Sequence, residues 1–308
     1  MTETQTLANK TRAMDALERA AELAERGVSS RPVVLVASGD LDPLVTTDVR
    51  PLLDRVMMGE HADEGLDSLL TTGVLDVLLP EVKGLVGFGD GEWRHKDVWK
   101  HTKQVVCQAV PRIEVRWAAL LHDIGKVKTR SIDEHGEVHF FGHAEVGARM
   151  FDKLERRRRL FAAEEELRST IRFLVLHHLR ASQYDGSWTD SAVRRFAREI
   201  GPHLDDLLCL SRADITTKRP EKKRRGIGYI NELAARITDL AAEDAKLPPL
   251  PTGVGNDIMA TFGIPPSKKL GDIKRALEAA VEAGEIPGQQ ESAFYLQFLA
   301  ENKGRFGL

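Results

Sequence analysis

The segment 120–126, LLHDIGK, sets a histidine and an aspartate side by side inside an apolar helical run. Imidazole and carboxylate groups are rarely buried unless they are paired or bind a metal. Two adjacent groups of this kind need a shared reason, and metal binding supplies one, because groups of the same chemistry recur along the chain. The metal-competent residues lie on five predicted helices: His101, His122, Asp123, His143, His177, His178 and Asp214.

The mixture of imidazoles and carboxylates indicates a divalent cation of intermediate softness, held inside a helical bundle. A site made only of oxygen ligands would instead favour magnesium or calcium. We therefore expect one or two divalent transition metal ions, drawn from Mn, Fe, Ni, Co and Zn. Neighbouring residues of a helix point about 100° apart, so His122 and Asp123 can reach one ion while Asp123 leans toward a second.

A carboxylate shared by two metals predicts phosphoester hydrolysis. Such a carboxylate positions a water whose pKa is lowered toward neutrality, so that it can attack phosphorus. Lys126 lies one turn beyond His122, where its ammonium group can hold a phosphate oxygen. Asp123 and Lys126 are therefore the expected catalytic residues, and Lys126 is also an expected substrate contact.

The competing interpretation of a single buried histidine is a hydrogen-bonded structural residue. That interpretation weakens here, because helices far apart in the sequence each offer a ligand type at an apolar face. The remaining histidines do not show this pattern. Four are expected at the surface, and one, in WRHKDVW, is either a surface residue or a substrate contact: His61, His135, His139 and His203, and then His95.

Composition describes an ordinary soluble protein, with 308 residues, 42% hydrophobic and 30% charged. Cys107 and Cys209 lack CxxC spacing and are expected to be reduced core residues. No signal peptide or membrane span is predicted, so we expect a cytoplasmic protein without a membrane partner. The net charge of −3 hides basic runs at 156–159 and 218–225. Such runs can hold phosphates, although they are more often solvated helix faces.

Almost all of the chain from residue 51 onward is predicted to be helical, because apolar residues recur at steps of three and four. A turn at 135–137 precedes a short extended piece, and PPLP at 248–251 marks a linker. The one strand expected is VVLV at 33–36, and a single strand cannot form a sheet. The fold class is therefore all-α. The predicted helices lie at 65–79 (two, broken at Gly73), 97–110, 115–125, 144–154, 164–178, 203–216, 229–246, 256–262 (Asn256 as N-cap, Gly263 as stop), 268–283 (Gly284 as stop) and 289–302.

These motifs resemble the HD-domain phosphohydrolase superfamily, whose signature is H…HD…D. The resemblance implies that one metal is bound by residues matching the signature: His101, His122, Asp123 and Asp214. His143 and the pair His177–His178 match the versions with a second metal, in which Asp123 would bridge. Within the pair, His177 is the expected ligand, and His178 is expected near the substrate together with Arg180.

A closer resemblance is to the C-terminal half of bacterial CCA-adding tRNA nucleotidyltransferases that carry an HD domain. It rests on KDVWKHT, RWAALLHDIGK, GHAEVGA, WTDSAVRRF and GNDIMATFGIPP, and it covers about residues 50 to 300. Those enzymes begin with a β-rich catalytic domain that has a Gly-Gly turn and an Asp-x-Asp motif. Here Asp40 and Asp42 follow the lone strand without a Gly-Gly turn. We interpret them as a chance match, and we expect the nucleotidyltransferase head and its nucleotide-adding activity to be absent.

The resemblance divides the chain into an N-terminal segment of unknown role (1–50), a helical segment (51–92), an HD phosphohydrolase domain (93–232) and a helical tail (233–308). It implies hydrolysis of phosphoesters on nucleotides or RNA ends, tRNA among them, with 2′,3′-cyclic phosphodiesterase or phosphatase chemistry favoured. Two alternatives stay open. One is hydrolysis of a free nucleotide such as a dNTP, a cyclic dinucleotide or a guanosine alarmone. The other is a non-catalytic RNA-binding module.

The basic run at 218–225 is the main sequence feature that favours RNA over a free nucleotide. It is expected to be a loop that emerges after the helix of Asp214, close to the mouth of the metal site. Its phosphate contacts would add affinity that is independent of base sequence and weakens with salt. The expected RNA-binding residues are Lys222, Lys223, Arg224 and Arg225, flanked by Lys218 and Arg219. The sequence leaves the oligomeric state open.

Overall fold

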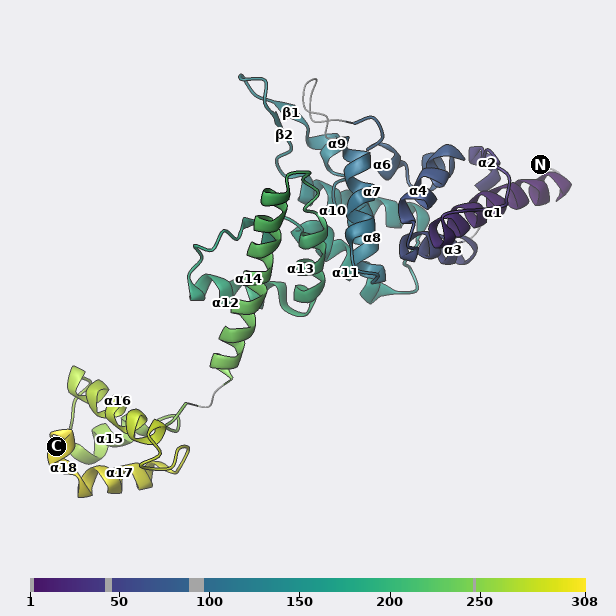
Figure 1. Ribbon diagram of the computed structural model, residues 1–308. Coiled ribbons are helices and arrows are strands. Elements are labelled where there is room, and N and C mark those ends of the chain that lie inside the picture. Colours follow the sequence, from purple (N-terminus) through teal and green to yellow (C-terminus); the bar gives the residue numbers. More distant parts are fainter. Residues whose placement is uncertain (1–2, 42–45, 89–96, 246–247) are drawn as a thin grey trace. The chain divides into compact units, whose positions relative to one another are not determined.

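The computed structural model describes residues 3–41, 46–88, 97–245 and 248–308. The chain divides into two compact units, Met1–Ile237 and Thr238–Leu308, each built almost wholly from helices (Figure 1). Within the described ranges the one sheet is a two-stranded hairpin, which confirms the predicted all-α class. None of the helices in the part of the chain that the structure describes has the length and apolar character of a membrane span.

The first unit begins with helices that pack around the alanine-rich face of α1. Five alanines of α1 and Leu17 are fully buried. Small side chains let α1 and α4 approach closely, since a Cβ added at Gly65 would lie 2.7 Å from the Cβ of Ala24. The helices of this part are α1 (Glu3–Arg26), α2 (Ser38–Leu41), α3 (Thr46–Met58), α4 (Ala62–Thr71), α5 (Val74–Leu78) and α6 (Pro80–Lys83). Gly73, in the left-handed conformation, separates α4 from α5 as predicted.

The strand predicted at 33–36 is wrong. The segment has no regular structure, and Leu35 is exposed. The amide of Val36 donates a hydrogen bond to the carbonyl oxygen of Thr72 at 2.8 Å, at the end of a helix. A helix end offers no ladder of backbone groups, so the extended segment does not become part of a sheet.

Asp40 has a structural role rather than a catalytic one. Its carboxylate accepts hydrogen bonds from the Arg12 guanidinium at 2.6 Å and from the Ala37 amide at 3.0 Å. The Arg12 contact holds the pKa of Asp40 below its usual value. Asp42, the second acid of the Asp-x-Asp match, lies outside the described residues.

The middle of the first unit is a helical bundle centred on α8. Every residue from Val115 to Leu121 is buried, which is typical of a helix enclosed on all sides. Around α8 pack α3, α7, α11 and α13 (Figure 1). The elements of this part are α7 (Val98–Gln108), α8 (Ile113–Leu121), α9 (Lys126–Thr129), β1 (Ser131–Ile132), β2 (Val138–His139), α10 (His143–Arg158), α11 (Glu165–His177), η1 (Ala181–Gln183), α12 (Asp190–Ile200), η2 (Gly201–His203), α13 (Leu204–Ala213) and α14 (Pro220–Asp244).

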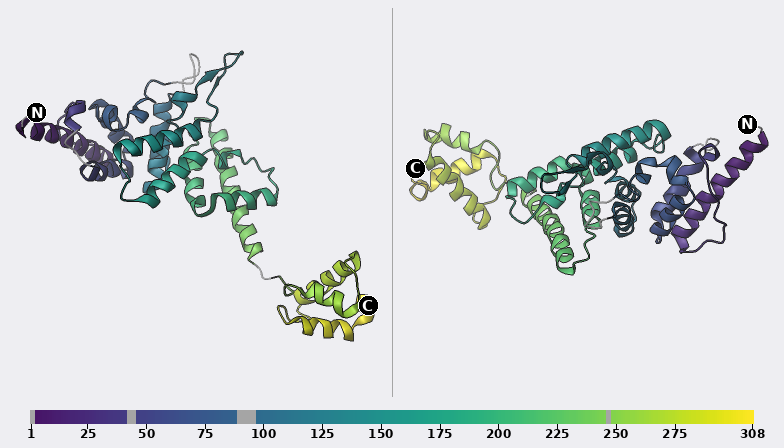
Figure 2. Two further views of the ribbon diagram at one scale, coloured as in Figure 1. Left: turned by 180° about the vertical axis from the view of Figure 1, so that it is seen from behind. Right: turned by 90° about the horizontal axis from the view of Figure 1, so that it is seen from above.

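The hairpin of β1 and β2 projects from this bundle between α9 and α10 (Figures 1 and 2). The strands pair antiparallel, with Ser131 opposite His139 and Ile132 opposite Val138. Gly136 at the turn has a φ of 77°, a conformation that glycine adopts without steric cost. The turn predicted at 135–137 and the extended piece after it are confirmed.

The basic run at 218–225 was expected to be a loop, and this expectation is wrong. α14 begins at Pro220, nine residues earlier than the helix predicted at 229–246, so most of the run forms its first turns. Proline suits the first turn of a helix, because its missing N–H would have no partner there. Lysine and arginine are good helix formers, which lets the helix continue through the run.

The second unit is a small helical domain with its own core. Its core includes Ile258, Leu277, Leu299 and Tyr295, all at most 2% exposed. The three predicted helices are confirmed, and Gly263 and Gly284 follow α15 and α16 in the left-handed conformation. The N-cap of α15 is Gly253 rather than Asn256. The helices are α15 (Val254–Phe262), α16 (Lys268–Glu282), α17 (Ser292–Glu301) and α18 (Lys303–Phe306).

Candidate metal centre

Four helix termini and one helix face of the bundle bring the candidate ligands together. His101 lies on α7, which begins at its N-cap Asp97, whose carboxylate accepts a hydrogen bond from the Lys100 amide. The other ligands lie where helices end or begin. His122 caps the end of the buried helix α8 and Asp123 follows it, His143 opens α10, His178 caps α11, and Asp214 caps α13.

The first cluster joins two imidazoles to two carboxylates. The Nε2 atoms of His101 and His122 lie 3.3 Å apart. The carboxylate of Asp123 lies 3.2 Å from His122 Nε2 and 3.5 Å from His101 Nε2, measured to its Oδ2 atom. Asp214 Oδ1 lies 3.0 Å from His101 Nε2 and 3.5 Å from His122 Nε2. Each of the two carboxylates therefore lies within 3.5 Å of both imidazole nitrogens.

The second cluster uses the other oxygen of the same aspartate. Asp123 Oδ1 lies 3.5 Å from His143 Nε2, and this nitrogen lies 3.2 Å from His178 Nε2. Asp123 and His122 are 1% exposed and His178 is 2% exposed. The two oxygens of Asp123 are thus divided between two imidazole pairs, which is the arrangement of a bridging carboxylate.

The orientation of the rings tests whether a cation fits. The Nδ1 atoms of His122, His143 and His178 each lie 2.8 Å from a backbone carbonyl oxygen, so each Nδ1 must donate a proton. In the neutral ring the Nε2 atom then carries a lone pair. Two such lone pairs face each other at 3.2 Å between His143 and His178. A cation between them removes this repulsion, so the residues of the second cluster fit a metal. In the first cluster, two carboxylate oxygens lie within 3.5 Å of two imidazole Nε2 atoms, a donor set that also fits a metal.

The charges of the two clusters differ in the isolated protein. Burial would lower the pKa of His122, but Asp123 and Asp214 outweigh burial and raise that pKa to about 10. Burial lowers the pKa of His143, and burial with the nearby His122 charge lowers the pKa of His178 to about 4. Despite its burial, Asp123 keeps a pKa below its usual value because of His122 and Lys126. His143 and His178 are therefore held neutral, the form in which imidazole binds metals.

The first cluster opens into a cavity of about 420 Å³. Lys126 lies at its wall, with its Nζ atom 2.6 Å from Asp123 Oδ2 and 5.6 Å from the centre of the Phe140 ring. This volume is within the range of small-ligand sites. The described residues that line the cavity are Val98, His101, Lys126, Phe140, Asp214, Ile215, Thr216 and Thr217.

The model of the HD domain family matches residues 98–218, a range that contains both clusters. Residues 98–218 form an HD domain. Over 82% of its length the chain is also 31% identical to the A-adding tRNA nucleotidyltransferase of Deinococcus radiodurans, of which it covers 58%. It is 30% identical over 81% of its length to the CC-adding tRNA nucleotidyltransferase of Thermus thermophilus, of which it covers 56%.

A shorter match, 33% identical over 39% of the chain, is to the multifunctional CCA protein of Azoarcus sp. strain BH72, of which the chain covers 31%. The chain is thus homologous to tRNA nucleotidyltransferases over most of its length, which confirms the resemblance that the motifs carry. It spans a little more than half the length of the first two relatives.

The structure places His178, and not the expected His177, at the second cluster. The second cluster contains His178, whereas His177 packs its ring on Phe173 with 4.3 Å between ring centres. His177 is the last residue of α11 and His178 its C-cap. Adjacent residues at a helix end point in different directions, and only His178 turns its Nδ1 atom back to the Val175 carbonyl and its Nε2 atom inward.

The HD domain does not bring Arg180 to the cavity. Its guanidinium lies 2.6 Å from Glu199 and 5.8 Å from the centre of the Phe196 ring. Arg180 is not among the described residues that line the cavity, so the expected substrate contact finds no support in its position. Lys126 lies at the cavity, but its ammonium group contacts the Asp123 carboxylate. His95, the other possible substrate contact, lies outside the described residues.

Two residues at the site are not predicted by the sequence motifs. Thr216 places its hydroxyl oxygen 2.8 Å from His101 Nδ1 and so orients that ligand. Phe140 lines the cavity, and its carbonyl oxygen is the acceptor for His143 Nδ1. Their positions in the sequence could have indicated them, because Thr216 lies two residues after Asp214 and Phe140 lies three residues before His143. A threonine or a phenylalanine does not indicate a metal site by its residue type alone.

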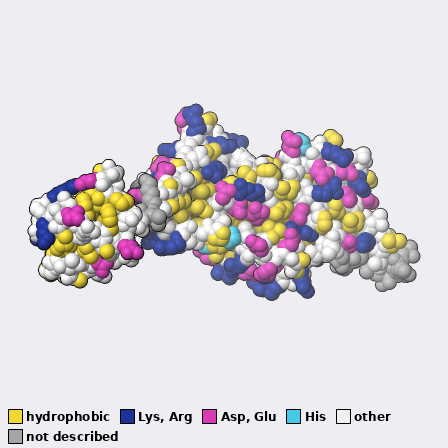
Figure 3. Space-filling view, turned by 90° about the horizontal axis from the view of Figure 1, so that it is seen from below, with side chains coloured by type: hydrophobic (Ala, Val, Ile, Leu, Met, Phe, Trp, Pro, Cys, Tyr) yellow, Lys and Arg dark blue, Asp and Glu magenta, His cyan; other side chains and the backbone are white. Residues whose placement is uncertain are grey.

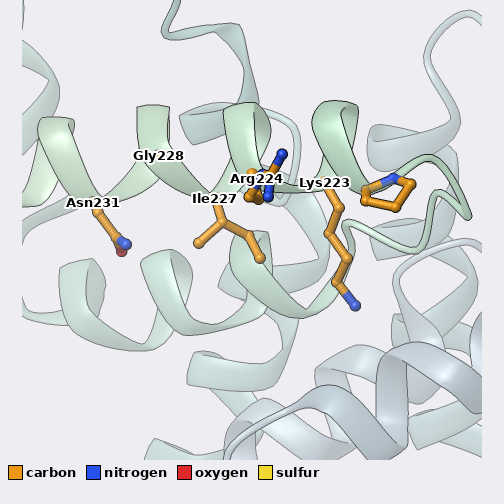
Figure 4. Close-up of a pocket in the computed structure, with 6 residues that line it drawn as sticks. Lys223, Arg224, Ile227, Gly228 and Asn231 are labelled. Atoms are coloured by element: carbon orange, nitrogen blue, oxygen red, sulfur yellow. The ribbon is translucent and has the colours of Figure 1, made fainter.

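The basic run of α14 borders a second cavity of about 410 Å³ (Figure 4). Lys223 donates a hydrogen bond to Gln108 Oε1 at 2.8 Å, and Arg224 pairs with Glu221. Lys222, Arg224 and Arg225 are exposed. The cavity is lined by Pro220, Lys223, Arg224, Ile227, Gly228 and Asn231.

Proposed function

We propose that the HD domain is a metal-dependent phosphohydrolase that acts on phosphoesters of nucleotides or RNA ends, with 2′,3′-cyclic phosphodiesters and phosphomonoesters as its favoured substrates. The observation that carries the proposal is the division of Asp123 between two imidazole pairs. A carboxylate so placed, 1% exposed and flanked by four Nε2 atoms, has little use in packing alone. It has a clear use between two cations.

The ligands of one ion would be His101, His122, Asp123 and Asp214, and those of a second would be Asp123, His143 and His178. Bound divalent ions supply Lewis acidity and lower the pKa of water. The protein's own residues orient the reactants. Thr216 fixes the His101 ring, and the carbonyl oxygens near the other imidazoles fix theirs. Lys126, at the cavity wall, is within reach of a phosphate oxygen there, as long as a cation takes over the Asp123 charge.

RNA ends are favoured by two lines of support. The two relatives that match about four-fifths of the chain are named for adding nucleotides to tRNA. In the chain itself, the face in Figure 3 mixes basic and acidic side chains, in keeping with a net charge of −3. Affinity for a polyanion must therefore come from a local cluster. We assign that role to the first turns of α14, with Lys222, Lys223, Arg224 and Arg225 as contacts to the RNA backbone.

A second candidate function is hydrolysis of a free nucleotide such as a dNTP, a cyclic dinucleotide or a guanosine alarmone. The cavity beside the first cluster favours it, because about 420 Å³ accommodates a nucleotide without any RNA surface. A purely RNA-binding module has no evident use for the buried ligand set. The two hydrolytic functions would use the same metal centre. They differ in whether the substrate continues beyond the cavity as an RNA chain or ends there as a free nucleotide.

The test combines metal analysis with a substrate panel. Elemental analysis of purified protein should find transition metal, and Asp123→Ala should lose both the metal and the activity while keeping its helical circular dichroism. Asp76→Asn is the matched control, since Asp76 pairs with Lys83 at 3.0 Å on the surface. The panel contains 2′,3′-cyclic nucleotides, nucleoside monophosphates, dNTPs and guanosine polyphosphates. Full activity of the wild type in chelator, or undiminished metal in Asp123→Ala, would refute the proposal.

A further inference from the structure

The segment that joins β2 to α10 presents an exposed aromatic surface. Phe141 is 77% exposed, the largest exposed fraction among the large apolar side chains of the described residues. Its ring stacks on that of His139, with 4.9 Å between the centres and an angle of 11° between the planes. We refer to His139 and Phe141 as the aromatic platform.

The aromatic platform is held in place rather than loosely exposed. His139 Nε2 lies 2.7 Å from Asp133 Oδ2. The other oxygen of Asp133 accepts hydrogen bonds from the amides of His135 and Glu137, both at 2.9 Å. The turn of the hairpin therefore fixes Asp133, Asp133 fixes the His139 ring, and that ring supports one face of Phe141. An exposed aromatic side chain without a binding role would not need these fixed contacts.

The aromatic platform lies next to the metal centre along the chain. Phe140 lines the metal cavity, and its carbonyl oxygen accepts hydrogen bonds from both the Nδ1 atom and the amide of His143. Phe141 and His143 are two residues apart, so their Cα atoms lie within about 7 Å of each other. Phe140 is half-buried and lines the cavity, whereas the neighbouring Phe141 is exposed to solvent. The two rings can therefore contact different parts of one substrate.

We propose that the aromatic platform stacks the base that precedes the terminal nucleotide of a single-stranded RNA whose end lies in the metal cavity. The inference rests on the proposed function. Exposed aromatic rings bind successive bases of single strands by stacking, whatever the base. Exposed Lys128 and Arg130, on the stretch that leads from Lys126 into the hairpin, supply the positive charge that the RNA backbone needs there. A free mononucleotide has no second base and does not reach the platform.

The test compares two substrates that differ by one nucleotide: a 2′,3′-cyclic mononucleotide, and a dinucleotide that ends in the same cyclic phosphate. Phe141→Ala should raise KM for the dinucleotide on the order of tenfold and leave its kcat and the mononucleotide kinetics unchanged. Phe141→Trp should restore the low KM, because indole also stacks. Ile132→Ala is the matched control, since Ile132 is 57% exposed on the same hairpin.

Equal losses on both substrates, or no change on either, would overturn the inference. Equal losses would mean that Phe141 serves only to position His143, and metal analysis of Phe141→Ala would then show a deficit. If the wild type hydrolyses neither substrate, the proposed function fails, and the platform is tested by binding. Quenching of Phe141→Trp fluorescence by the dinucleotide but not by the mononucleotide would support the platform, and absence of quenching would refute it.

Discussion

At the scale of single residues, the candidate metal centre depends on how each imidazole ring is oriented. His122, His143 and His178 share one device: the Nδ1 atom donates to the carbonyl oxygen three residues earlier in the chain, at 2.8 Å in each case. This bond fixes the tautomer and directs the Nε2 atom inward. His101 lies within α7, where the backbone carbonyl groups are already bonded within the helix. Its Nδ1 atom is paired instead with the hydroxyl group of Thr216, from another segment. Partners of this kind are worth 10–100-fold in metal affinity in other sites.

The orientation of the rings predicts different effects for the two adjacent histidines at the end of α11. His178→Ala removes a ligand of the second cluster, so it should lower the metal bound per chain and the phosphoesterase activity. His177→Ala should leave both at the wild-type level, because the His177 ring packs on Phe173 outside the clusters. Elemental analysis of the two variants, purified in parallel, is the measurement. The assignment is wrong if His177→Ala is the variant that loses metal.

At the scale of elements, the two clusters meet because the turn after α8 lies against the start of α10. Gly125 is the point of contact: a Cβ placed there would lie 2.0 Å from the carbonyl oxygen of His143 and 2.7 Å from the amide nitrogen of Gly147. Both neighbours are backbone atoms, which cannot swing aside as side chains do. The glycine in HDIGK therefore sets the distance between the segment that carries Asp123 and the helix that carries His143.

Gly125→Ala is accordingly predicted to separate the clusters. The added methyl group must push α10 away, which should cost about 1–3 kcal/mol of folding stability and weaken metal binding at the second cluster most. Thermal unfolding and metal content per chain measure the two effects. Gly271→Ala is the matched control, because its Cβ would lie 3.6 Å from the end of the Arg275 side chain, an ordinary contact. Wild-type metal content in Gly125→Ala would contradict this account of the turn.

The elements also show how far the sequence could predict the structure. The bundle helices, the break at Gly73 and the stops at Gly263 and Gly284 were predictable, because periodicity and left-handed glycines are local properties. So was the first cluster, because His122 and Asp123 both belong to it, and neither His101 nor Asp214 has a neighbouring histidine or aspartate that could take its place. The choice between His177 and His178 was not, because it depends on how the last turn of α11 faces the bundle.

Among the elements that were not predicted, α1 and the first turns of α14 show two different reasons. α1 buries alanines against Gly65, and a face of small residues has a weak apolar signal although it packs at close range. The basic run is predicted as a loop because proline and a cluster of like charges are both typical of loops. In the structure Pro220 only begins α14, and the charges lie along the solvated side of its first turns.

At the scale of the whole molecule, the two units have different contents. The metal centre, the aromatic platform and the basic run belong to the first unit, and the second has a separate core around Tyr295. Tyr295 is fully buried, and its hydroxyl donates a hydrogen bond to the Pro287 carbonyl oxygen. The described core of the second unit is thus built from its own residues, and both metal-competent clusters are built from residues of the first.

The whole chain carries a net charge of −3. An RNA meets a molecule that repels it on average, so binding should depend on where the positive charges lie and not on their number. Replacing Lys222, Lys223, Arg224 and Arg225 with alanine should weaken binding of an RNA that ends in a 2′,3′-cyclic phosphate, and it should flatten the dependence of log K on log salt. Hydrolysis of a 2′,3′-cyclic mononucleotide should stay near wild type, because these side chains do not line the metal cavity.

A control quartet on α10 and α11 removes the same four positive charges elsewhere on the first unit. Replacing Arg149, Lys153, Arg156 and Arg168 with alanine should change RNA affinity less, and the salt slope little, since these residues border neither cavity. Equal weakening by both quartets would mean that only net charge matters, and α14 would lose its assigned role. Loss of mononucleotide hydrolysis in the α14 quartet would instead place the basic run in the architecture of the metal site, through the bond between Lys223 and Gln108 of α7.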